Sequence, residues 1–175
     1  MDIKPALFYS ISDLSYILDR GVYIAFKRLR FSSALLHLWP ARSTRYLFSV
    51  NYEQDLKKEN KHRPRPATVL EEQQVCIVHE LIHAAILEKD LGFKGTYEDL
   101  EGLIDDHAYT FLGNNLFFEE LIREIDKRKN CRFFFKEEIF NRDGETQCPF
   151  YHYYNRVLNR ESQPMLPWGV EVYGY

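Results

Sequence analysis

The spacing of apolar side chains predicts three consecutive helices between residues 68 and 129. In the first helix, the apolar positions that recur at helical spacing are Val75, Val78, Ile82 and Ile86. Thr68 and Glu71 form a capping box in front of this run, so we expect the helix to begin there and to end near Asp90. This long helix, with a marked start and end, is the clearest element of the sequence.

Two further helices are expected after the first. Thr96 is the expected N-cap of the second helix, and Gly113 ends it. Its apolar stripe consists of Leu100, Leu103, Ile104, His107, Ala108 and Phe111. The third helix is expected from Asn115 to Lys129. The remaining region, up to residue 175, is aromatic and reads as irregular, with a turn at residues 141–144.

The pattern before residue 68 is less regular. Residues 45–52 alternate aromatic or apolar side chains with polar ones, which predicts a strand. Residues 12–31 carry both helical and strand signals, and Gly21 interrupts any single long helix. Residues 53–67 are polar, charged and contain prolines, which predicts a loop or linker.

These elements predict an α+β fold in which a small antiparallel or mixed sheet packs on the long helix and on further helices. The chain of 175 residues suits one domain. We divide it into an N-terminal helix and strand part (1–52), a basic loop (53–67), a helical core (68–128) and an aromatic C-terminal part (129–175).

Composition narrows the class of protein. Hydrophobic residues make up 45% of the chain and charged residues 28%, which excludes a disordered protein and a fibrous one. The aromatic share of 15% predicts a core built on large rings. No apolar stretch is long enough to span a bilayer, the first residues do not resemble a signal peptide, and the three cysteines are widely spaced. We therefore expect a cytoplasmic protein without a membrane partner.

Charge is unevenly distributed along the chain. Residues 1–67 contain 12 Lys and Arg against 6 Asp and Glu, whereas residues 68–128 contain 5 against 14. A solvated surface or attraction between the two parts is the simplest interpretation. Nucleic-acid binding through the basic first third is a weaker alternative, because its basic residues are dispersed.

The first helix contains an HExxH motif, His79-Glu80-Leu81-Ile82-His83. Residues four apart lie on one helix face, so His79 and His83 can bind the same metal ion. Glu80 can reach a water molecule next to that ion without being a ligand, which makes it the expected general base. The motif therefore predicts metal-assisted hydrolysis, and two imidazoles with a carboxylate favour Zn2+.

A catalytic zinc site needs a third protein ligand, and the next helix offers several. Glu101 is the preferred candidate, because Asp105 lies four residues later on the same face and could orient one histidine from behind. Glu98, Asp105 itself and His107 remain alternatives, although His107 belongs to the apolar stripe.

At this point the chain resembles the gluzincin branch of zinc metallopeptidases, on the motifs His79-Glu80-x-x-His83 and Glu101-x-x-x-Asp105. The resemblance covers residues 68–112. It implies a zincin-like fold, zinc ligands His79, His83 and Glu101, a catalytic base Glu80 and Asp105 in contact with a ligand. The pattern of the branch with a third histidine, HExxHxxGxxH, is absent, since positions 86 and 89 are Ile and Lys.

The resemblance also implies two features of the substrate site. An edge strand of a sheet in front of the motif helix would pair with an extended substrate, and residues 45–52 could supply it. A Tyr or His would stabilise the oxyanion; His152, Tyr153 and Tyr154 are chemically suitable, although packing of these rings in the core is the commoner outcome.

The sequence thus favours a zinc-dependent peptidase acting on a peptide or protein. The alternative is a zincin-fold binding or regulatory protein with weak or no catalysis, such as an antirepressor or a toxin-system component.

Overall fold

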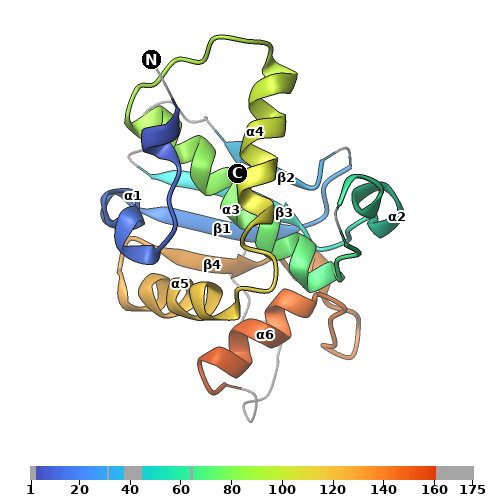
Figure 1. Ribbon diagram of the computed structural model, residues 1–175. Coiled ribbons are helices and arrows are strands. Elements are labelled where there is room, and N and C mark those ends of the chain that lie inside the picture. Colours follow the sequence, from blue (N-terminus) through green and yellow to red (C-terminus); the bar gives the residue numbers. More distant parts are fainter. Residues whose placement is uncertain (1–2, 31, 38–44, 64, 161–175) are drawn as a thin grey trace.

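The computed structural model describes residues 3–30, 32–37, 45–63 and 65–160, without the side chains of Leu35, His37 and His62 (Figure 1). The α-helices are α1 (Ser15–Arg20), α2 (Leu56–Glu59), α3 (Val69–Glu88), α4 (Tyr97–Tyr109), α5 (Asn115–Lys127) and α6 (Pro149–Val157). The strands are β1 (Val22–Lys27), β2 (Ala34–His37), β3 (Tyr46–Asn51) and β4 (Arg132–Phe135). Short 3-10 helices are η1 (Lys4–Ala6), η2 (Ile11–Leu14), η3 (Asn60–His62) and η4 (Glu137–Ile139). The predicted α+β class is confirmed.

The four strands form one sheet in the order β2-β3-β1-β4. β1 pairs in parallel with both β3 and β4, whereas β2 runs antiparallel to β3. The sheet is therefore not purely antiparallel. The two middle strands are buried along most of their length, as expected for parallel strands covered on both faces.

The predicted strand at 45–52 is confirmed as β3, but its expected place at the edge of the sheet is wrong. β3 lies between β2 and β1, and the outer strand on that side is β2. The parallel neighbour β1 comes from the ambiguous region 12–31, which folds as η2, α1 and then β1. Gly21 separates helix from strand with a φ of 120°, a conformation that side chains rarely adopt, and a Cβ there would lie 2.9 Å from the carbonyl oxygen of Asn130.

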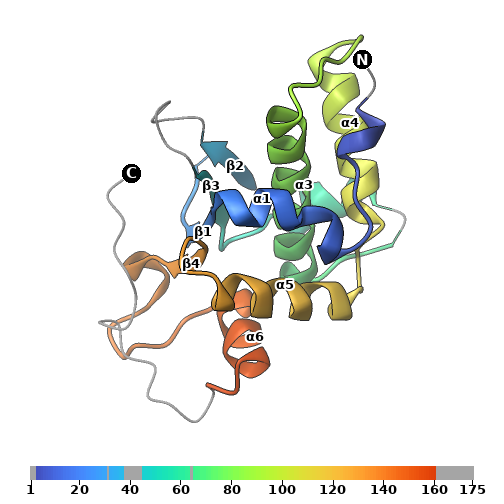
Figure 2. The same ribbon diagram turned by 90° about the vertical axis from the view of Figure 1, so that its left-hand side faces the viewer.

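Helix α3 is the centre of the molecule. Figure 2 shows it between the sheet and α4. Twelve of its 20 residues are buried, and they lie on all faces of the helix, as is typical of a helix enclosed by other elements. The predicted capping box is present at its start, where Thr68 accepts from the Glu71 N–H, and the predicted N-cap of α4, Thr96, accepts from the Asp99 N–H.

The aromatic C-terminal part is more regular than the sequence indicates. It contributes the edge strand β4 and the helix α6, and the rings of Phe26, Phe135 and Phe150 stack between them and β1. Short apolar runs next to aromatic residues fit either a strand or a helix, so their neighbours in the fold decide. The predicted turn is present, with the Gly144 N–H bonded to the Asn141 carbonyl. The tail, residues 161–175, lies outside the described part.

Residues 53–67 form more than the predicted loop. They contain the short helices α2 and η3, and the Asp55 side chain caps α2 by accepting from the Lys58 N–H. Among the described residues, no helix combines the length and the apolar character needed to cross a membrane. The three cysteines are buried and unpaired.

Candidate metal centre

Packing of α4 against α3 brings three potential metal ligands together. His79 and His83 lie one turn apart on α3, with ring centroids 5.0 Å from each other. Glu101 on α4 faces both: its Oε2 lies 2.7 Å from His79 Nε2, and its Oε1 lies 2.7 Å from His83 Nε2. Within the part of the chain that the structure describes, these three residues are the one group whose arrangement could hold a metal ion.

The donor set fits a metal ion chemically. One donor atom from each residue lies within 4.8 Å of the other two. Glu101 Oε1 is a buried carboxylate oxygen 2.7 Å from His83 Nε2, and the structure gives it no hydrogen-bond partner. A buried carboxylate oxygen left in this way is costly unless a cation satisfies it. Two imidazoles and one carboxylate are the ligands of a known class of catalytic zinc site.

Asp105 lies behind His79, one turn after Glu101 on α4. Its Oδ1 is 3.7 Å from His79 Nδ1, while Nε2 of the same ring faces Glu101. The two nitrogens of His79 therefore face different carboxylates. This arrangement favours a proton on Nδ1 and leaves Nε2 as the donor to a metal ion.

The charges of this cluster shift the pKa values of its members. Burial of the His79 imidazole lowers its pKa, but the contacts with Asp105 and Glu101 outweigh burial and raise the pKa to about 9. Burial raises the pKa of Glu101, but the two histidines outweigh it and hold that pKa below its usual range. The pKa of Asp105 is lowered as well: burial acts against this shift, and His79 and Arg63 cause it.

Glu80 is buried next to the two histidines, with 6% of its surface exposed. Burial raises the pKa of its carboxyl, while the charges of His79 and His83 and a backbone hydrogen bond from Leu36 act in the opposite direction. A carboxyl with a raised pKa in a cleft is suited to accept a proton and to release it again.

The site opens into a cavity of about 810 Å³. The residues that line it come from α3, α4, β2, the end of α2 and Arg63, and they include His79, Glu80, His83 and Glu101. β2 and the two residues before it form one wall, and Tyr97, Leu100 and Gly102 of α4 contribute to another. The volume is in the range of known ligand pockets.

Two of the alternative ligands lie elsewhere. His107 points away from the cavity, because its Nε2 lies 2.7 Å from the Phe8 carbonyl and its ring packs against Phe8 and Phe111. This is the satisfied histidine that the apolar stripe predicts. Glu98 is exposed and does not line the cavity.

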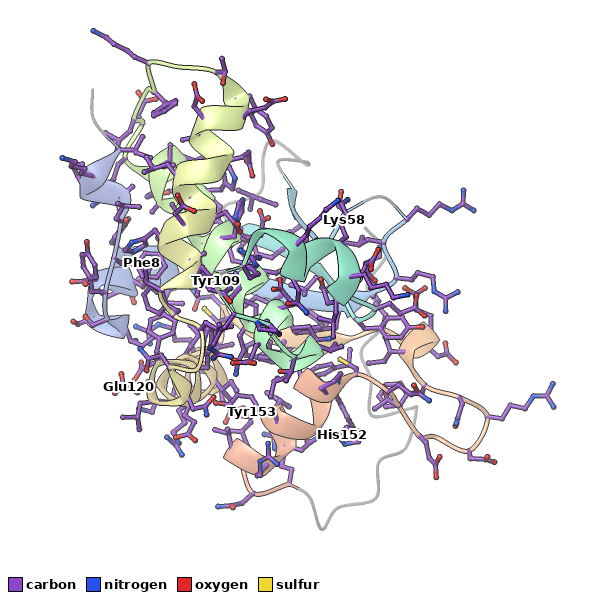
Figure 3. All side chains as sticks on the ribbon, turned by 45° about the vertical axis from the view of Figure 1, so that its right-hand side comes forward. Phe8, Lys58, Tyr109, Glu120, His152 and Tyr153 are labelled. Atoms are coloured by element: carbon purple, nitrogen blue, oxygen red, sulfur yellow. The ribbon has the colours of Figure 1, made fainter. Side chains whose placement is uncertain are left out.

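His152, Tyr153 and Tyr154, the possible oxyanion or substrate residues, are not brought to the metal centre; packing elsewhere is the commoner outcome for such rings. Figure 3 shows His152 and Tyr153 on α6, below the end of α4 where Tyr109 lies. His152 Nε2 contacts the Thr146 carbonyl, Tyr153 donates to the Asn115 carbonyl, and Tyr154 packs against Phe133 and Phe135. None of the three lines the cavity.

Three features of the site were not predicted from the sequence. β2, and not β3, is the strand that lines the cavity, and a four-residue strand in an apolar stretch has too little periodicity to be recognised. Arg63, which contacts Asp105, belongs to the segment 53–67, for which the sequence predicts a loop. Tyr97 also lines the cavity. Burial and the Glu101 carboxylate raise the pKa of the Tyr97 phenol. Tyr97 lies one turn before Glu101 on the same helix face, and this spacing is a signal that could have identified it.

Comparisons of the chain with protein-family models, with curated proteins and with solved structures found no match.

Proposed function

We propose that this chain is a zinc-dependent peptidase with a zincin-like fold. One observation carries the proposal: His79 and His83 of α3 meet Glu101 of α4 in a cavity, with the buried carboxyl of Glu80 beside them. A site with three protein ligands and an open side is the arrangement of catalytic rather than structural zinc.

In this proposal, His79, His83 and Glu101 hold the ion, and Asp105 orients His79. When bound, zinc would polarise the peptide carbonyl and lower the pKa of a water molecule. Glu80 takes the proton of the attacking water and passes it to the leaving amine. Its raised pKa supports this role, because a base that must also act as an acid works best with a pKa near the operating pH.

The proposed substrate is an extended peptide. β2 is the outer strand of the sheet on the side of the cavity, and residues 32–34 and Leu36 line that cavity. Backbone groups at the edge of a sheet can pair with an added strand. A peptide bound along β2 would pass the carboxyl of Glu80, which has a hydrogen bond from the Leu36 backbone.

The decisive experiment compares the wild type with Glu80→Gln on a peptide library, after the metal content of both proteins has been measured. The variant should keep its metal and lose about 10²- to 10⁴-fold in kcat/KM, the range for removal of a general base. Glu98→Gln, which changes an exposed acid outside the cavity, is the control and should behave as the wild type.

Two outcomes would contradict the proposal. Wild-type protein that binds no zinc would overturn the metal centre. A Glu80→Gln variant that keeps its metal and its full biological effect would instead favour a binding or regulatory protein.

A further inference from the structure

Arg63 lies at the centre of a buried cluster of charges next to the candidate metal centre. Its side chain is only 6% exposed, although it comes from the polar segment 53–67. Its Nε lies 3.0 Å from Glu72 Oε1, and its Nη2 lies 3.0 Å from Glu72 Oε2. Glu72 is fully buried on α3. Glu59 approaches to 3.9 Å, and the guanidinium lies 4.6 Å from the centroid of the Tyr109 ring. Arg63 is therefore held on several sides.

The remaining guanidinium nitrogen of Arg63, Nη1, points to Asp105. Nη1 lies 2.6 Å from Asp105 Oδ2, and the other oxygen, Oδ1, is the one that faces His79 Nδ1. One oxygen of Asp105 is thus hydrogen-bonded to Arg63, and the other faces the His79 ring without a direct hydrogen bond. The order of contacts is Glu72, Arg63, Asp105 and His79, and it runs from α3 through the segment 53–67 and α4 back to α3.

We propose that Arg63 is a positioning residue of the metal centre, acting through Asp105 on His79. The paired contacts with Glu72 fix the plane of the guanidinium, and the guanidinium in turn fixes the rotation of the Asp105 carboxylate. That carboxylate holds the His79 ring with Nε2 toward Glu101. The inference rests on the proposed function, since it concerns the same metal centre.

The contacts require arginine and not merely a positive charge. A guanidinium presents its N–H groups in a rigid plane, so it can bind Glu72 with two of them and Asp105 with a third. A lysine ammonium is a point charge on a flexible chain and cannot keep both carboxylates in fixed orientations. Arg63→Lys therefore keeps the charge and removes the geometry.

The test is zinc affinity, measured by competition with a chelator for the wild type, Arg63→Lys and Asp105→Asn. Both variants should bind zinc about 10- to 100-fold more weakly, the usual cost of losing a partner of a metal ligand. Arg65→Lys is the matched control, because Arg65 comes from the same segment and pairs with Glu71 at 2.8 Å on the surface. The control should keep the affinity of the wild type.

The double variant Arg63→Lys/Asp105→Asn separates positioning from a general loss of structure. If Arg63 acts through Asp105, the double variant should bind zinc no more weakly than Asp105→Asn alone. Losses that simply multiply, or unchanged affinity in Asp105→Asn, would overturn the proposal. The Asp105→Asn result stands even if Arg63→Lys fails to fold, since the Asp105 side chain is 40% exposed. Wild type without zinc affinity would overturn the proposed function itself, whereas normal affinity in a folded Arg63→Lys would overturn only the role of Arg63.

Discussion

Helix α3 and the segment 53–67 both contribute to the candidate metal centre, but in different ways. α3 supplies His79, Glu80 and His83 from five consecutive positions, and the helical backbone alone fixes their spacing. The segment supplies Arg63, whose partners Glu72 and Asp105 lie 9 and 42 residues later in the chain. The first contribution follows from local structure, and the second exists only in the folded molecule.

This difference has consequences for what each region controls. The side chains of α3 contact the reacting groups in our proposal, so changing them should remove binding or chemistry. In the segment 53–67, Arg63 reaches the ligand His79 only through Asp105. Changing this segment should therefore weaken metal binding without abolishing it.

The largest effect is expected from α3 itself. His83→Ala removes one of the three proposed ligands, so the metal content of the purified protein should fall from about one ion per chain to near none. The side chain is 21% exposed, so the fold should persist, which circular dichroism can check. His152→Ala is the control, because that side chain lies on α6 outside the cavity; loss of metal in this control would contradict the structure.

An intermediate effect is expected from the contact between α3 and α4 in metal-free protein. The pKa of His79 is about 9 in the folded state against 6.5 for an ordinary histidine, so its stabilising charge is complete below pH 6.5 and is lost as the pH rises through 9. The free energy of unfolding should therefore fall by about 1–3 kcal/mol over this interval.

Urea unfolding of chelator-treated protein at pH 6.5 and pH 9.5 measures this change. Other groups titrate in the same interval, so the contribution of His79 is the difference between the wild type and His79→Gln. The variant should show a smaller decrease. Equal decreases in both proteins would mean that Glu101 and Asp105 do not stabilise the charged imidazole.

The smallest effect is expected within α4, at Gly102. This glycine lies in the helix interior on the cavity wall, and a Cβ there would have no atom within 4 Å. Gly102→Ala should therefore raise the free energy of unfolding by about 0.5–1 kcal/mol through helix propensity alone. Thermal unfolding measures it, and a destabilised variant would show that the site is more crowded than the structure indicates.

Several parts of the fold could be predicted because their signals are local. α3 and α4 are identified to within a few residues by the capping box at Thr68, the N-cap at Thr96 and the apolar spacing that follows each. The strand at 45–52 was equally recognisable from its alternation. Its place in the sheet was not, since the order β2-β3-β1-β4 depends on which strands meet and not on the pattern of any one of them.

The aromatic C-terminal part shows the opposite case. Phe135 and Phe150 stack on Phe26 in the core, and Phe133 packs against Phe150. His152 and Tyr153 contact backbone carbonyls near their own helix or on α5. A tyrosine or histidine carries the same donor whether it packs in a core or faces a substrate. Residue type could therefore not distinguish the rings of α6 from Tyr97, which does line the cavity.

A four-residue step in an α-helix is nearly one full turn, so the motif alone places His79 and His83 on one helix face, next to Glu80. Three other features follow from the packing of the folded chain: Glu101, rather than Glu98 or His107, faces both imidazoles, β2 lines the cavity, and Arg63 connects Glu72 to Asp105. These contacts join elements far apart in the chain, and their geometry is set by how α4, β2 and the segment 53–67 pack around α3.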